Sequence, residues 1–192
     1  MALKGEIRII AGRWRGRKLP VLSSQGLRPT TDRSKETLFN WLAPYLDGSN
    51  CLDCFSGSGS LGFEAVSRGA RQAILLEKER AAASQLMANQ QKLAAEQMSI
   101  IQTDSLTWLA KPASMQFDLV FIDPPFGLGL VPQTIALLSE YGWLAPAAWI
   151  YIETEQHHAP LNLPISWQRH RQKQAGQVCS RLFQYQPSTD KE

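Results

Sequence analysis

Residues 50–70 read NCLDCFSGSGSLGFEAVSRGA, and this stretch decides the fold. It begins with a short apolar run, continues through a glycine-rich turn, and ends in a helix-forming segment closed by Gly69. Glycine permits a tight turn after a strand and a close approach between the backbone and a neighbour. The order of strand, glycine turn and helix predicts the first unit of an α/β sheet.

The same rhythm continues on the C-terminal side. Apolar runs that predict strands occupy residues 72–77, 98–103, 117–123 and 147–154, while residues 79–96 and 131–144 predict helices. Short buried strands alternating with helices indicate a parallel sheet with helices on both faces. Residues 164–186 instead predict two strands around Ala175–Gly176. The fold class is therefore α/β: a Rossmann-like, seven-stranded, mostly parallel sheet with an antiparallel C-terminal hairpin.

The segment before residue 50 is basic. Residues 6–21 predict a short β-hairpin, and residues 33–46 predict a helix ending near Pro44. The first 35 residues hold nine Lys or Arg and two acids, a charge of +7, which leaves −4 for the rest of a chain whose net charge is +3. Such an extension indicates an arm that binds a polyanion, and a solvated charged surface is the alternative. We expect residues 1–30 to form this extension and residues 31–192 the main domain.

The composition sets broad limits. With 192 residues, 44% of them apolar and 19% charged, the chain predicts a packed core in one domain with an appendage. It has no bilayer-length apolar run and no apolar segment typical of a signal peptide, so we expect a cytoplasmic protein without a membrane partner. The cysteines are expected to be buried and unreactive, and neither they nor the histidines show metal-site spacing: Cys51, Cys54, Cys179, His157, His158 and His170.

The glycine turn also carries a cofactor signal. Gly57, Gly59 and Gly62 form G-x-G-x-x-G after a strand, and Glu77 follows 20 residues after Gly57 at the end of the next strand. This satisfies the dinucleotide pattern, in which the acid accepts hydrogen bonds from ribose hydroxyls. Asp53 is poorly placed for an anionic diphosphate, whereas it suits a cofactor with an ammonium group and a sulfonium.

A further acid follows the third strand. Asp104 is placed to accept a hydrogen bond from an adenine amino group, with Ser105 beside the ring. The set LDCFSGSG, LLEK and TDSL resembles class I methyltransferases that use S-adenosylmethionine. Structural roles remain open beside these: Asp53 bracing the turn through backbone amides, and Asp104 capping a helix.

Residues 121–127, FIDPPFG, end the fourth strand, which is expected beside the first at the topological switch point. Asp123 and the Pro124 carbonyl can accept the two hydrogens of an exocyclic amino group and so localise its lone pair. Pro124 and Pro125 fix the backbone in advance, and Phe126 offers a face for a base. The alternative is a simple tight turn. The tetrapeptide resembles the amino-group methyltransferases, whose substrates are adenine in DNA or RNA, guanine in RNA, and a protein glutamine amide.

A closer resemblance covers residues 6 to about 185. RIIAGRWRGRKLPV, LRPTTDRSKETLFNWLAP, CLDCFSGSGSLGFEA, FIDPPF, YGWLAP and AGQVCSRLFQY together resemble the bacterial RsmD family, which methylates the 2-amino group of one guanine in 16S ribosomal RNA. The resemblance implies S-adenosylmethionine as cofactor, no metal, and 16S rRNA in the assembled or partly assembled small subunit as partner.

The resemblance also implies three groups of site residues. The catalytic group is Asp123, Pro124, Pro125 and Phe126. The cofactor would be held by Asp53, Phe55, Ser56, Gly57, Gly59, Glu77, Lys78, Asp104 and Ser105. The RNA phosphates would be held by Arg8, Arg13, Arg15, Arg17, Lys18, Arg28 and Arg33.

Other functions predict other features. An adenine-directed DNA methyltransferase would carry a target-recognition domain larger than the roughly 50 spare N-terminal residues. A protein-glutamine methyltransferase would more typically have Asn at position 123 and no basic arm. An NAD-dependent oxidoreductase would have no use for DPPF. A non-catalytic RNA-binding module is the remaining alternative, and the intact glycine turn argues against it. We expect a monomer.

Overall fold

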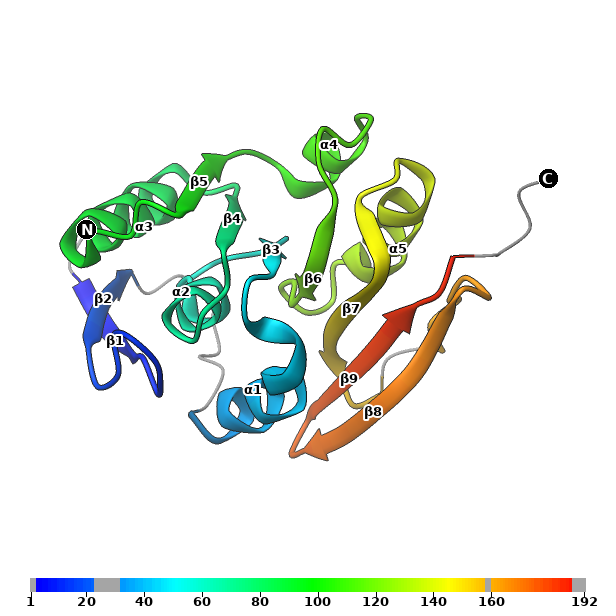
Figure 1. Cartoon of the computed structure of the whole chain (residues 1–192), viewed down its shortest axis with the longest axis horizontal. Helices are drawn as coiled ribbons and strands as arrows, with labels where there is room; N and C mark the ends of the chain where they lie inside the picture. Colours follow the sequence, from blue (N-terminus) through cyan, green and yellow to red (C-terminus); the bar gives the residue numbers. More distant parts are fainter. Residues whose placement is uncertain (1–2, 23–31, 158–159, 188–192) are drawn as a thin grey trace.

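The computed structural model describes residues 3–22, 32–157 and 160–187. The predicted fold class is confirmed: a seven-stranded sheet has the order β5-β4-β3-β6-β7-β9-β8 (Figure 1). Its strands are β3 (Asn50–Asp53), β4 (Gln72–Glu77), β5 (Met98–Gln102), β6 (Phe117–Ile122), β7 (Leu144–Glu155), β8 (Trp167–Ala175) and β9 (Val178–Tyr185).

Strands β3 to β7 are parallel, and β9 joins β7 in antiparallel register with β8 on its outer side. Strand β3 lies between β4 and β6, so the predicted neighbours at the switch point are adjacent. The helices are α1 (Asp32–Leu46), α2 (Ser60–Ser67), α3 (Arg80–Leu93), α4 (Ser105–Leu109) and α5 (Leu130–Glu140).

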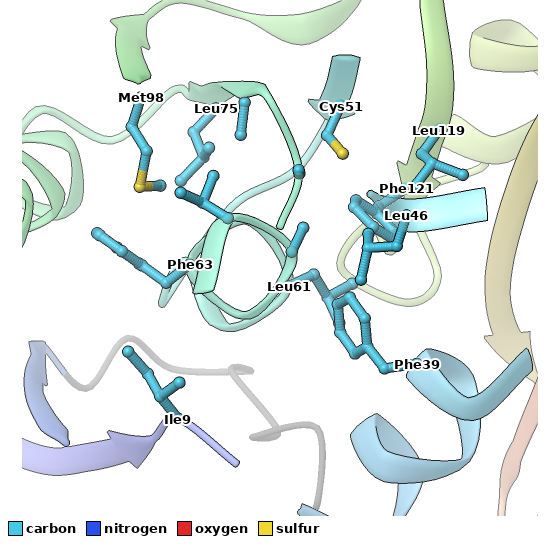
Figure 2. Packing of buried hydrophobic residues seen from close by; sticks show 14 of the residues in the cluster. Ile9, Phe39, Leu46, Cys51, Leu61, Phe63, Leu75, Met98, Leu119 and Phe121 are labelled. Carbon is cyan, nitrogen blue, oxygen red and sulfur yellow. The ribbon is translucent and has the colours of Figure 1, made fainter. Parts of the chain in front are cut away.

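The sheet separates two apolar cores. Alternate residues of a strand point to opposite faces. In β3, Cys51 therefore faces the core that α1, α2 and α3 cover, and Leu52 faces the core that α4 and α5 cover. Figure 2 shows the first core, where Phe39 of α1 and Phe63 of α2 pack beneath the sheet. Layers on both faces leave the ends of the strands as the place where polar groups collect.

The N-terminal segment forms the predicted hairpin, β1 (Leu3–Arg8) paired antiparallel with β2 (Lys18–Leu22). Its apolar side is part of the first core, because Ile9, Trp14 and Leu19 are buried together with residues of α2 and α3. Fully burying such side chains contributes about 1.5–3 kcal/mol each. The hairpin is therefore held on the α2 and α3 side of the sheet by packing.

Helix α1 continues past the proline that was expected to end it. Pro44 lies in its last turn, and the helix ends at Leu46. Two residues follow Pro44 in the helix, because a proline this close to the end removes one hydrogen bond without ending the helix at that point. Leu38 and Leu42 are buried, whereas Tyr45 is 40% exposed and stacks on Trp149, with ring centroids 4.4 Å apart.

Candidate active site

Four carboxylates lie at one edge of the sheet. Asp53 ends β3, Glu77 ends β4, Asp104 follows β5, and Asp123 follows β6. Because these four strands are neighbours and parallel, their carboxyl ends meet at the same edge. The structure therefore brings together the four acids that the sequence analysis selected.

The glycine turn between β3 and α2 is tight. Gly57 and Gly59 have φ values of 50° and 76°, which glycine adopts without strain. The Gly59 amide donates to the Ser56 carbonyl at 2.6 Å, and the Ser56 amide donates to the Leu76 carbonyl at 3.0 Å. A Cβ on Gly59 would lie 2.6 Å from Leu86 and 2.7 Å from Phe63, so glycine also lets α2 pack closely.

Asp53 is 2% exposed and braces the start of α2. Its Oδ2 accepts a hydrogen bond from the Gly62 amide at 3.3 Å, and its carbonyl accepts one from Ser56 Oγ at 3.1 Å. Burial raises the pKa of Asp53 to about 7, and the hydrogen bond from Gly62 acts in the opposite direction. Asp53 thus has the structural role considered above, and a nearby cation would favour its ionised form.

Glu77 links β4 to the glycine turn. Its Oε2 accepts from the Gly57 amide and its Oε1 from the Glu79 amide, both at 2.8 Å. Burial raises the pKa of Glu77, while these amides lower it. Each carboxylate oxygen has a second lone pair, so both can also accept from the hydroxyls of a ribose.

Asp104 caps α4. Its Oδ1 accepts from the Thr107 amide at 3.0 Å, and Lys78 Nζ lies 3.2 Å from its Oδ2. The Thr107 amide lowers the pKa of Asp104, and Lys78 adds to this. Ser105 Oγ donates to the Cys54 carbonyl, which ties the start of α4 to the residue after β3. Phe55, which follows Cys54 in the chain, is partly buried against the second core. The helix cap is therefore present, and a role in adenine binding stays a prediction.

The last three residues of the tetrapeptide, Pro124, Pro125 and Phe126, border a cavity of about 190 Å³. Pro124 is buried, Pro125 is exposed and Phe126 is 37% exposed, so part of the Phe126 side chain is accessible to a ligand. Gly127, Leu128 and Gly129 continue the wall, and Glu153 and Thr154 of β7 close it on the other side. The cavity therefore combines an aromatic ring with carboxylates.

The sequence analysis missed a polar cluster beside Asp123. Ile122 pairs with Ile152, so the next residues, Asp123 and Glu153, lie side by side at the ends of β6 and β7. The Tyr151 hydroxyl contacts Glu153 Oε2 at 2.6 Å and Ser180 Oγ at 3.0 Å. Burial raises the pKa of Tyr151, and the charges of Glu153 and Asp123 act in the same direction. A glutamate in the otherwise apolar run AAWIYIET was the available signal.

The predicted RNA-binding side chains of the hairpin are exposed. Arg8, Arg13, Arg15, Arg17 and Lys18 all face solvent, as does Arg33 in the first turn of α1. The Arg13 guanidinium lies 5.6 Å from the centre of the Trp14 ring, and Lys18 pairs with Glu6 at 3.2 Å. Arg28 lies outside the described residues.

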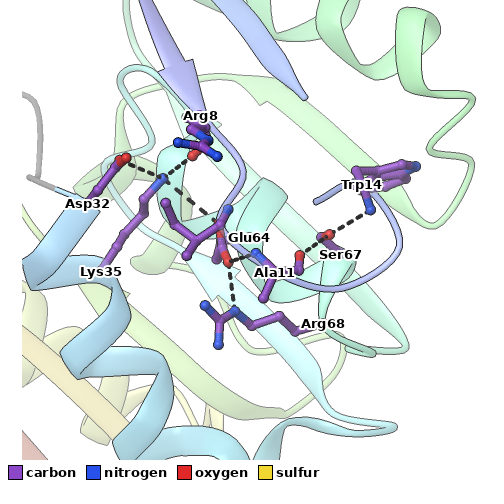
Figure 3. Close-up of polar contacts among 9 residues, drawn as sticks. Arg8, Ala11, Trp14, Asp32, Lys35, Glu64, Ser67 and Arg68 are labelled. Carbon is purple, nitrogen blue, oxygen red and sulfur yellow. Dashed lines mark hydrogen bonds and ion pairs between the residues drawn. The ribbon is translucent and has the colours of Figure 1, made fainter. Parts of the chain in front are cut away.

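The loop of the hairpin is fixed on α2 through Glu64, which is completely buried (Figure 3). Glu64 accepts from the amides of Ile10 and Ala11 at 2.8 and 3.0 Å. It also pairs with Arg68 at 2.6 Å and with Lys35 of α1 at 3.8 Å. This network was not predicted, although an acid inside the apolar helix segment LGFEAV was a visible signal.

A second contact adjoins it. Ser67 Oγ donates to the Ala11 carbonyl at 2.6 Å and accepts from the Trp14 amide at 3.0 Å. Lys35 Nζ donates to the Arg8 carbonyl, while burial lowers the pKa of Lys35 and the nearby Glu64 raises it. Helix α2, which begins at the glycine turn, therefore holds the basic hairpin at its other end.

Two absences concern the described residues alone. Within residues 3–22, 32–157 and 160–187, no cluster of three or more His, Cys, Asp or Glu is arranged to hold a metal ion. In the same part of the chain, no helix combines the length and the apolar character needed to cross a membrane.

Comparison with known proteins identifies the family and supports the fold. The model of the family described as Conserved hypothetical protein 95 matches residues 7–184. The chain is 54% identical to Ribosomal RNA small subunit methyltransferase D of Haemophilus influenzae, over 94% of this chain and 95% of that protein. It is 51% identical to the protein of the same name from Escherichia coli, over 94% and 90% of the two chains.

Solved structures give the same result. A structure from Escherichia coli, assigned as a methyltransferase, has a TM-score of 0.90 at 48% identity and covers 95% of this chain and 99% of that one. An RNA methyltransferase from Salinibacter ruber, solved with S-adenosyl-L-homocysteine, is 14% identical, has a TM-score of 0.63, and shares the fold over 86% of this chain and 98% of its own. The chain belongs to the Conserved hypothetical protein 95 family, together with the ribosomal RNA small subunit methyltransferase D proteins.

Proposed function

We propose that the protein transfers a methyl group from S-adenosylmethionine to the 2-amino group of a guanine in 16S ribosomal RNA of the small subunit. The observation that carries this is the position of Asp123, Pro124 and Phe126 at the end of β6, beside the glycine turn that follows β3. The relatives named for small-subunit rRNA methylation support the substrate.

The residues at the ends of β3, β4 and β5 fit this cofactor. Asp53 would face the ammonium and sulfonium end, because a buried carboxylate with a raised pKa gains from an adjacent cation. Glu77 would accept from the ribose hydroxyls, and Asp104 from the adenine amino group, with Phe55, Ser56, Gly57, Gly59, Lys78 and Ser105 completing the site. When bound, the cofactor supplies an electrophilic methyl group.

The chain's own residues would activate the nucleophile. The lone pair of a guanine 2-amino group is delocalised into the ring, which makes the nitrogen a weak nucleophile. Asp123 and the Pro124 carbonyl would accept its two hydrogens and localise that lone pair. Pro125 keeps these acceptors in place before the substrate arrives, so little reorganisation is needed during the reaction.

Phe126 would stack on the base. Base-on-aromatic stacking contributes about 1–3 kcal/mol per base, which is comparable to the few kcal/mol needed to unstack an extruded nucleotide. The partly exposed ring at the edge of the cavity suits this role. The predicted cations of residues 1–30, together with Arg33, would bind RNA phosphates, and residues 31–192 would form the catalytic domain.

The test uses tritiated S-adenosylmethionine with three acceptors: small subunits from a strain lacking this gene, naked 16S RNA, and double-stranded DNA. Digestion then identifies the labelled nucleoside. We expect label in 2-methylguanosine from the subunits. Label in methyladenine would keep the role of Asp123 and change the substrate to adenine, and the absence of label in every acceptor would favour a non-catalytic RNA-binding module.

A further inference from the structure

Charge is divided into three blocks along the chain. The first 35 residues carry +7, and residues 36–155 carry −7 because they hold six basic and thirteen acidic side chains. Residues 156–189 hold no acid and four basic residues: Arg169, Arg171, Lys173 and Arg181. The N-terminal arm therefore accounts for one of two positive blocks, and the second has no role in the function proposed above.

Three of the four cations in the second block, Arg169, Arg171 and Lys173, lie on the outer strand of the sheet, and Arg181 lies on its neighbour β9. Strand β8 is the last in the strand order, and eight of its nine residues are exposed. An edge strand rich in Lys and Arg has a known structural value, because charge prevents pairing with another chain. Edge protection does not require the positive charges to lie near the candidate active site. Their position therefore distinguishes edge protection from a role in binding at that site.

The strand register places β8 close to the catalytic carboxylate. Asp123 follows Ile122, which pairs with Ile152, so Asp123 is level with Glu153. Glu153 pairs with Ser180, and Ser180 pairs with Lys173. Lys173 thus lies three strands from Asp123, or about 14 Å at the usual strand spacing. Arg171 is two residues from Lys173 and on the same face of the strand.

That face is also the one that carries the N-terminal hairpin. Lys173 Nζ donates to Thr37 Oγ1 of α1 at 2.9 Å, and on the opposite flank of α1, Lys35 donates to the Arg8 carbonyl. Helix α1 therefore contacts both basic hairpins, which lie on either side of it in Figure 1. In the strand order, the tetrapeptide after β6 lies between the β4 side, where the N-terminal hairpin packs, and the β8 edge.

We propose that Arg171 and Lys173 on β8 form a second RNA-backbone contact, on the far side of the catalytic site from the N-terminal hairpin. The inference rests on the proposed RNA substrate. Two phosphate contacts on opposite sides of Asp123 would hold an RNA strand at both ends of the target nucleotide, so that its base enters the cavity beside Phe126. The partner is RNA because β8 carries three cations and no acid, and phosphate contacts dominate such basic interfaces.

The experiment measures binding of small subunits lacking the methyl group, and of naked 16S RNA, over a range of salt concentrations. The test variant is Arg171→Gln with Lys173→Gln. The matched control is Arg71→Gln with Lys111→Gln. These two exposed cations precede β4 and β6, so they lie toward the amino ends of the strands, away from the four carboxylates. A second variant, Arg171→Lys with Lys173→Arg, keeps both charges.

We expect the test variant to reduce the slope of log affinity against log salt by about 1.4, at about 0.7 for each single-strand phosphate contact. The control and the charge-preserving variant should keep the wild-type slope. An unchanged slope in the test variant would overturn the proposal. Self-association of that variant would then identify protection of the sheet edge as the role of these charges. A loss seen with subunits but not with naked RNA would also overturn it, since the partner would then be a ribosomal protein.

Methyl transfer by the wild-type protein separates this proposal from the function on which it rests. If wild-type protein labels no RNA, the proposed function fails. If it labels guanine while the test variant keeps the wild-type slope, the second contact alone fails.

Discussion

At the scale of single residues, the proposed function assigns Asp123 to the chemistry and not to cofactor binding. Asp123 follows β6 and directly precedes Pro124, which lines the cavity, whereas Asp53 and Glu77 lie at the glycine turn. Asp123→Ala should therefore reduce methyl transfer by at least a hundredfold, within the range attributed to a positioned acceptor or base. Affinity for S-adenosylmethionine, measured by calorimetry, should change by less than threefold. A large loss of cofactor affinity would place Asp123 in the cofactor site instead.

Asp53 should affect protein stability and cofactor affinity, unlike Asp123. Burial raises its pKa from 3.8 to about 7, so between these values the folded protein binds more protons than the unfolded chain. Stability then falls as the pH rises from about 4 to 7, and the penalty, at most about 4 kcal/mol, is complete above pH 7. Asp53→Asn should unfold at a higher temperature than wild type at pH 8, and the difference should disappear near pH 4.

The same variant should lose cofactor affinity, because the amide cannot neutralise a cation. Glu140→Gln, at an exposed acid, is the control and should change neither property. Equal melting temperatures of Asp53→Asn and wild type at pH 8 would show that the carboxylate is not destabilised by its site.

The placement of the four acids was predictable from the sequence, while their roles stay predictions. The acids at the ends of β3, β4, β5 and β6 were identified because each ends or follows an apolar run. Tyr151, Glu153 and Ser180 were not, because their meeting depends on the register of β7 against β9, which the sequence does not state.

At the scale of elements, the contact between the N-terminal loop and α2 can be tested with two glycines. Gly12 and Gly16 both have a φ of 80°. A Cβ on Gly12 would lie 1.8 Å from the Ser67 carbonyl oxygen, whereas a Cβ on Gly16 meets nothing within 4 Å. Alanine at either position carries the same left-handed strain of about 1–2 kcal/mol, so the difference between the variants isolates the contact.

We expect Gly12→Ala to lower the unfolding temperature more than Gly16→Ala and to speed hydrogen exchange at the Ile10, Ala11 and Trp14 amides. These amides donate to Glu64 and Ser67, and leaving a buried hydrogen-bonding group without its partner costs about 1–3 kcal/mol, and more where the group is charged. Equal effects of the two substitutions would mean that the loop is not held by this contact.

Elements were largely predictable because their signals are local. Strand β4 coincides with the predicted residues 72–77, and the turn of the C-terminal hairpin falls at Gly176 as expected. Helix α1 differs, because it continues through Tyr45 and Leu46 after Pro44, where Leu42 packs in the core and Tyr45 stacks on Trp149. That contact comes from a strand 100 residues away, which no local pattern contains.

At the scale of the whole molecule, the arginines of the N-terminal hairpin lie apart from the candidate active site. Arg13, Arg15 and Arg17 are exposed on a hairpin that packs against α2 and α3. Changing all three to Gln should reduce the salt slope of RNA binding by about 2, at about 0.7 for each contact, and leave cofactor affinity unchanged. A wild-type slope in this variant would show that the arm does not bind phosphates.

The strand order of the sheet was predictable from the sequence, whereas the position of the N-terminal hairpin on α2 was not. Alternating elements and the switch point predicted the strand order around β3 and β6. The placement of the hairpin on α2 depends on Glu64, Lys35 and Arg68, charged residues that a linear reading assigns to surfaces. Burial of such charges becomes visible only when the elements are assembled.

The three cysteines give a means of observing how the sheet opens. Cys51 and Cys54 lie at the central strand and Cys179 in β9, and all three are buried free thiols. Burial raises the pKa of Cys51 to about 12 and that of Cys54 well above its usual value, so neither forms a thiolate in the closed protein. A thiol reagent should therefore react only after local opening, with Cys179 labelled before the central pair if the C-terminal hairpin detaches first. Mass spectrometry would give the order in which the cysteines are modified, and this order would show whether β9 or β3 opens first.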